Sequence, residues 1–148
     1  MSIGETAGPI HPIPTRRSSH VYLFYVKHHG GALNASQWSV DREEEFAVFD
    51  SADQHDFSDE RGWLYGIGRD AEGEIQDLGI WGQQVAEFPF ARPDERWHGY
   101  PHWPLKEFGP QNRKGERCRP NKEVFLKMEA ANVLTPQERK RLYKGDHA

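Results

Sequence analysis

Short apolar runs with strand-like spacing dominate the first half of the chain. His20–Lys27 is rich in β-branched and aromatic residues and is apolar on both faces, which predicts a strand in the interior of a sheet. Phe46–Asp50 follows an acidic run and predicts a second strand. The polar residues at 50–59 that come next indicate a loop.

The segment Gly62–Leu78 carries the clearest strand signal. One of its faces is apolar at alternate positions: Trp63, Tyr65 and Ile67. Asp70–Gly73 supplies turn residues, with Gly73 free to take a positive φ, so Glu74–Leu78 is expected to pair back as a hairpin. Beyond it, apolar residues spaced for one face predict a short helix: Ile80, Trp81, Val85 and Phe88.

The C-terminal region predicts two helices. Asn121 is a suitable cap for a helix from Lys122 to Ala131, with Val124, Phe125, Met128 and Ala131 on one face. Asn132 suits the left-handed residue that ends it. Thr135–Glu138 has the pattern of a capping box with proline at the first helical position, and it predicts a second helix that stops at Gly145.

Together these elements predict an α+β fold. We expect a small, mostly antiparallel sheet, an irregular segment rich in aromatic residues and proline, and a C-terminal helical hairpin. The length of 148 residues suits one domain at 20–148, after a flexible N-terminal lead-in at 1–19. Within the domain the predicted parts are a sheet-rich body at 20–87, an aromatic and then basic loop at 88–120, and the hairpin at 121–145.

Charge is divided unevenly along the chain. Lys106–Ala148 holds eleven Lys/Arg and six Asp/Glu, a net charge of +5, whereas the other 105 residues hold eight and seventeen, a net charge of −9. This division points to an acidic or polyanionic partner for one end of the protein, or to packing of the two regions on each other.

Composition also bears on location. No apolar run approaches the length of a membrane span, and the N-terminus lacks the features of a secretory signal. Cys118 is the only cysteine, so no intrachain disulfide is expected and a reducing compartment fits best. The expectation is a soluble, cytoplasmic protein without a membrane partner.

The most unusual stretch is 88–108, which combines six aromatic residues with four prolines. Proline disfavours helices and central strands, while large rings favour burial over disorder. We therefore expect an ordered, irregular segment laid over the sheet. Its rings Trp97, Tyr100 and Trp103 are the predicted recognition surface.

The same stretch supplies the candidate catalytic residues Arg96, His98, Tyr100 and His102. One histidine would act as base and the other as acid, with the guanidinium stabilising an anionic transition state. A metal site is not expected, because Pro101 lies between the two histidines and breaks helical chelation geometry. Phosphate-loop, dinucleotide-binding and nucleophile-elbow motifs are absent, so no cofactor is predicted.

Basic residues gather before and within the helical hairpin, whose outline resembles a helix-turn-helix. The candidate binding residues are Arg113, Lys114, Arg117, Arg119, Arg139, Lys140, Arg141 and Lys144.

Two hypotheses follow from these patterns. The first is a non-catalytic binding module that presents an aromatic-proline groove and a basic helical edge to a protein or to nucleic acid. The alternative is a metal-independent, toxin-like nuclease that uses His98 and His102 with Arg96. The sequence leaves open whether the protein is an enzyme, and it does not predict an oligomeric state.

Overall fold

The structure is a computed structural model that describes residues 10–12, 21–24, 37–80, 82–92, 96–102 and 122–144. Its elements in chain order are β1 (Ile10–Pro12), β2 (Val21–Leu23), α2 (Arg42–His55), β3 (Leu64–Gly66), β4 (Ala86–Phe88), β5 (Tyr100–Pro101), α3 (Lys122–Ala130) and α4 (Pro136–Lys144). The predicted α+β class is confirmed, with an antiparallel three-stranded sheet and two C-terminal helices.

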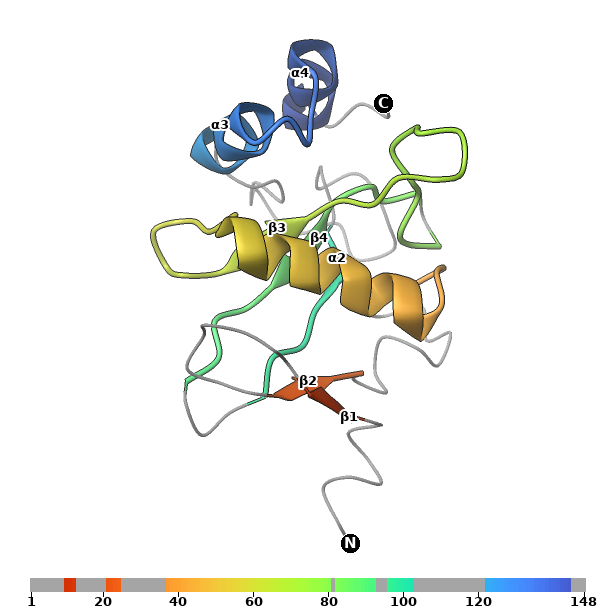
Figure 1. The fold of residues 1–148 in the computed structure, drawn as a ribbon, viewed down its shortest axis with the longest axis vertical. Helices are drawn as coiled ribbons and strands as arrows, with labels where there is room; N and C mark the ends of the chain where they lie inside the picture. The colour runs from red at the N-terminus through yellow and green to blue at the C-terminus, as the bar shows by residue number, and fades with distance from the viewer. Residues whose placement is uncertain are drawn as a thin grey trace, which may run out of the picture.

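The central sheet has the order β3-β4-β5, and α2 crosses one of its faces (Figure 1). The approach is close, because a Cβ atom on Gly66 would lie 2.8 Å from both Cγ1 and the carbonyl oxygen of Val48. Side chains alternate along a strand. Tyr65 and Glu87, which are opposite each other in the register, therefore belong to the face away from α2.

The predicted strand at 46–50 and loop at 50–59 are wrong, because α2 runs through most of both. Asp41 caps the helix in a capping box with Glu44, and the acidic run therefore forms a favourable first turn. The buried residues of α2 recur at helical spacing: Glu45, Val48, Phe49, Ala52 and Asp53. The chain leaves the helix through Asp56 in the left-handed conformation.

The predicted hairpin at 62–78 is right in its turn and wrong in its strand partner. The Asp70 N–H donates to the Glu74 carbonyl, and Gly73 has φ of +81°. Arg69 and Ile75 form an antiparallel bridge. The strand β3, however, pairs with β4.

The predicted helix at 80–88 is wrong. Gly82 adopts φ of 77°, and the Leu78 N–H donates to the Gln83 carbonyl, which closes a tight turn instead. The chain then enters β4, whose three residues are all buried. Ile80 is 48% exposed and so takes no part in the core.

The strand β2 forms a two-stranded antiparallel sheet with β1. The lead-in at 1–19 was expected to lack regular structure, so β1 corrects that expectation at Ile10–Pro12. On its other side β2 bonds to Trp97, whose N–H donates to the Val21 carbonyl and whose carbonyl accepts from the Leu23 N–H. The strand therefore has neighbours on both edges, as predicted for its buried sequence.

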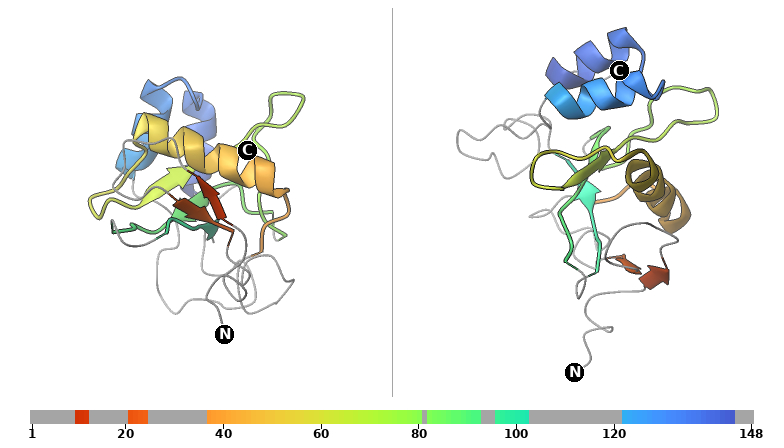
Figure 2. Two further views of the ribbon diagram at one scale, coloured as in Figure 1. Left: turned by 60° about the horizontal axis from the view of Figure 1, so that its bottom comes forward. Right: turned by 60° about the vertical axis from the view of Figure 1, so that its left-hand side comes forward.

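The predicted C-terminal hairpin is confirmed, although the expected cap Asn121 and the expected end at Gly145 lie outside the described residues. Asn132 has φ of 60° after α3, and Thr135 and Glu138 bond reciprocally at the start of α4. The buried residues of α3 are the apolar face that the sequence indicated: Val124, Phe125 and Met128. Figures 1 and 2 show α3 and α4 side by side at the end of the molecule away from β1 and β2.

An aromatic cluster forms the centre of the core. Phe49 of α2 contacts Tyr22, Phe88 and Trp97, with ring centroids 4.8, 5.3 and 5.6 Å away. These rings bring together β2, α2, β4 and the segment that precedes β5. Among the described residues, no helix has the length and apolar character that a membrane span requires.

Candidate functional site

A row of polar side chains crosses the face of the sheet away from α2. Tyr65 on β3, Glu87 on β4 and Tyr100 on β5 are opposite one another in the strand register. The Tyr100 hydroxyl donates to Glu87 Oε1 at 2.5 Å. His102 lies two residues beyond Tyr100, on the same side of the strand, and its Nδ1 is 3.3 Å from Glu87 Oε2. One carboxylate therefore holds a phenol and an imidazole together.

Glu87 is ionised in this setting. Burial by itself raises the pKa of its carboxyl, but the hydrogen bond and charge of His102, followed by the hydrogen bond from Tyr100, outweigh burial and lower that pKa to about 2. The pKa of the Tyr65 hydroxyl is raised, first by burial and then by the charges of Glu87 and Asp59. The phenol is therefore a neutral donor at physiological pH.

His102 has one unused nitrogen. Its residue exposure is 9%, and the buried Nε2 has no hydrogen-bond partner in the described part of the chain. Nδ1 faces the carboxylate and is the nitrogen placed to donate to it, so Nε2 is the nitrogen left for a further contact. Because that nitrogen is buried, another molecule could reach it only after the residues covering it had moved.

The row continues past Tyr65 into the loop before β3. The Tyr65 hydroxyl donates to Asp59 Oδ2 at 3.0 Å and accepts from Arg61 Nη2 at 3.0 Å. Arg61 also pairs with Asp59 at 2.9 Å and lies over the ring of Trp63, 3.8 Å from its centroid. These contacts fix the hydroxyl of Tyr65 next to Glu87.

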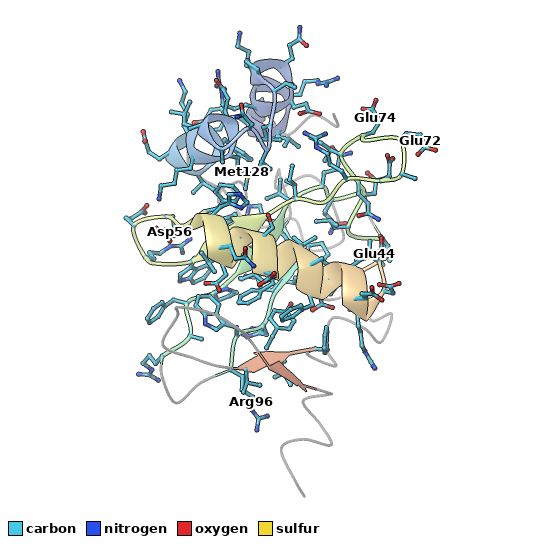
Figure 3. The ribbon with its side chains drawn as sticks, viewed as in Figure 1. Glu44, Asp56, Glu72, Glu74, Arg96 and Met128 are labelled. Atoms are coloured by element: carbon cyan, nitrogen blue, oxygen red, sulfur yellow. The ribbon has the colours of Figure 1, made fainter. Side chains whose placement is uncertain are left out.

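The structure brings together only part of the predicted catalytic set. Tyr100 and His102 meet on Glu87, as described above. Arg96 is exposed beside β2, and Figure 3 places it at the lower end of the molecule. Six extended residues span about 20 Å, so Arg96 and His102 are at opposite ends of their segment. His98 is half-buried on the stretch between them.

The predicted aromatic surface is largely core. Trp97 is 1% exposed and contacts Phe49 and Phe90, so its ring has no face left for a partner. Tyr100 is half-buried and belongs to β5. This strand lies at the edge of the sheet, where Pro101 is tolerated. The stretch therefore contains regular structure that was not predicted. Trp103, Arg113, Lys114, Arg117 and Arg119 lie outside the described residues.

The cations of α4 divide into two kinds. Arg139 is bonded through Nε to Glu129 of α3. Lys140 and Arg141 are exposed and make no ion pair with any residue in the described ranges. Lys144 is the last residue of α4. Lys122, at the start of α3, is exposed in the same manner as Lys140 and Arg141.

Exposed charges differ between the hairpin and the first turn of α2. Figure 3 shows side chains that end in nitrogen extending outward from α3 and α4, whereas Glu44, Glu72 and Glu74 lie on α2 and the turn after β3. Within the described ranges, exposed cations are thus frequent on the hairpin, which also carries the carboxylates of Glu129 and Glu138.

A second ion pair holds α4 in place. Arg69 donates to both carboxylate oxygens of Glu138, at 2.7 and 2.9 Å, and to the Val133 carbonyl at 2.6 Å. A cavity of about 340 Å³ next to it is lined by Arg69, Glu129, Asn132, Leu134, Thr135 and Pro136. Its charged residues already have partners within the protein.

Sequence reasoning missed Glu87 and Arg69. Glu87 lies in an apolar run, and a single acidic residue in such a run indicates a buried carboxylate that has a partner. Arg69 has no such signal, because its partner Glu138 is 69 residues away. In the described part of the chain, no group of three or more His, Cys, Asp or Glu side chains is arranged to hold a metal ion.

Comparisons with known proteins add no family and no function to these observations. No family model, no curated protein and no solved structure matches the chain.

Proposed function

We propose that the protein is a non-catalytic binding module that holds a polyanionic macromolecule on its C-terminal hairpin. We define the cationic face as the exposed side chains of Lys122, Lys140 and Arg141. The observation that carries the proposal is that these three side chains make no ion pair within the described ranges, while Arg61, Arg69 and Arg139 are each paired with a carboxylate.

Unpaired surface cations can exchange their counterions for phosphate or sulfate groups, and the release of those ions favours binding. The acidic residues in the first turn of α2, away from the hairpin, repel the same partner. The charge distribution therefore supports both attraction and orientation. A cytoplasmic location belongs to the same proposal, because the single Cys118 suits a reducing compartment.

The test is the salt dependence of binding to a mixed-sequence 20-base-pair DNA duplex, followed by fluorescence anisotropy. Each phosphate contact contributes about 0.9 to the slope of log affinity against log salt, so K140E/R141E should reduce that slope by roughly 1 if one of the two residues contacts phosphate and by roughly 2 if both do. The matched control is R42E/R96E, which makes the same charge change at two exposed arginines away from the hairpin. Equal losses in both double variants, or no salt-dependent binding at all, would refute the proposal.

A second candidate function rests on the contact between Glu87 and His102. In a metal-independent nuclease, His102 Nε2, which is buried in this structure, would have to be uncovered before it took the proton from an attacking ribose hydroxyl, with Glu87 holding the imidazole and Tyr100 beside it. The test is cleavage of an RNA oligonucleotide. H102A should abolish turnover, and E87Q should shift the acid limb of the pH–rate profile. Turnover that survives H102A rules this candidate out.

A further inference from the structure

We propose that the polyanion is duplex DNA and that α4 lies in its major groove. This inference rests on the proposed function, because it takes the cationic face as the binding surface and names what the surface recognises. It is argued from the dimensions of α4, from its exposed side chains and from the contacts that fix it.

The dimensions of α4 fit the groove. Nine residues at 1.5 Å each give a helix about 13 Å long, and with its side chains a helix is about 10–12 Å across. The major groove of B-form DNA is about 12 Å wide and admits a helix of this size. Figure 2 shows α4 at the end of the molecule, with α3 beside it.

The exposed side chains of α4 are of the kinds that read bases. Gln137, Lys140 and Arg141 are spaced at i, i+3 and i+4, so they share one face, while Glu138 and Leu142 are buried on the other. Glutamine pairs with the N6 and N7 atoms of adenine, and arginine pairs with O6 and N7 of guanine. Gln137 and Arg141 are about 6 Å apart along the axis, close to two base steps.

The helix is also held in one orientation. Arg69 fixes its first turn through Glu138, and Arg139 ties it to Glu129 of α3. Asn132 sets the direction of the connection by its left-handed conformation. A rigid reading helix loses little conformational freedom on binding, which favours discrimination among partners.

The same surface is poorly suited to single strands. Proteins that bind single-stranded nucleic acid stack bases on exposed aromatic rings. On α3 and α4, Phe125 is fully buried and Tyr143 is half-buried against it at 6.2 Å between ring centroids. Duplex RNA is disfavoured for another reason, because its major groove is too deep and narrow for side chains to read.

The first experiment compares three fluorescent ligands of the same mixed sequence and length: duplex DNA, duplex RNA and single-stranded DNA. Binding of the full chain is measured by anisotropy at one fixed, low salt concentration. We expect duplex DNA to bind at least about tenfold more tightly than the other two. Equal or tighter binding of duplex RNA or single-stranded DNA overturns the inference and leaves polyanion binding intact.

The second experiment selects preferred sequences from a randomised duplex library and repeats the selection with two variants. Q137A should remove the preference at one base position and leave the salt slope unchanged. K140A should weaken binding to all sequences alike and reduce the slope by about 1. Selection of no sequence by the unaltered protein, or an unchanged preference in Q137A, refutes base reading by α4. Absence of any salt-dependent binding refutes the proposed function as well.

Discussion

Replacing Glu87 with glutamine should reduce the acid sensitivity of the fold. The folded pKa of Glu87 is about 2, against about 4.3 for a glutamate in an unfolded chain. A folded pKa below the unfolded one means that the stabilisation is present above the unfolded value and is lost as pH falls through the folded value.

The size of the effect follows from that difference. A difference of about 2.3 pKa units, at 1.36 kcal/mol each, corresponds to roughly 3 kcal/mol of stability near pH 7. By the same relation about 0.4 kcal/mol remains at pH 2, so nearly all of the loss falls between pH 5 and pH 2. Glu87 is 6% exposed, so solvent screening takes little away from this figure.

The assay is urea unfolding, followed by tryptophan fluorescence, at a series of pH values from 7 to 2. E87Q should be less stable than the unaltered protein by roughly 3 kcal/mol at pH 7 and by less than about 1 kcal/mol at pH 2. The control is E72Q, because Glu72 is exposed on the turn after β3 and should change stability by no more than about 0.5 kcal/mol. If the E87Q curve runs parallel to that of the unaltered protein, the contacts of Glu87 do not stabilise its charged form.

Three further substitutions probe the elements that carry the fold. T135A removes the hydroxyl that accepts from the Glu138 N–H and should cost about 1 kcal/mol in a thermal melt; a melt equal to the parent's would show that the cap contributes nothing. W97A empties a fully buried site and should cost about 3–5 kcal/mol in urea unfolding; normal stability would show that the ring is not core. G66A places a methyl group 2.8 Å from Val48 and should cost about 1–3 kcal/mol, partly restored by V48A; a lack of rescue would locate the strain elsewhere.

The parts of the fold that sequence could predict are those determined by near neighbours. The helical hairpin was predicted because the cap at Thr135, the left-handed Asn132 and the apolar face of α3 are all local features. The turn at Gly73 was found for the same reason. Each of these depends on contacts within a few residues, where propensity and capping rules apply.

The errors came from patterns that fit two structures equally well. Phe46–Asp50 has the composition of a strand, yet the cap at Asp41 and the burial of Ala52 and Asp53 place it in a helix. A short apolar run cannot by itself distinguish the two periods.

The candidate site was partly predictable. Tyr100 and His102 were identified as residues, but the group that joins them, Glu87, comes from another strand. Which strands become neighbours depends on tertiary pairing, and the sequence had paired β3 with the wrong partner. The row of polar side chains across the sheet therefore could not be predicted from the sequence.

The carboxylate of Glu138 makes α4 form and dock in a single step. The same side chain accepts from the Thr135 N–H to begin the helix and binds the Arg69 guanidinium of the distant turn. A helix of nine residues is too short to persist alone in water. The amide protons of α4 should consequently exchange with solvent as one group together with those of the turn at 69–75, so that an opening event that frees the helix also frees the turn.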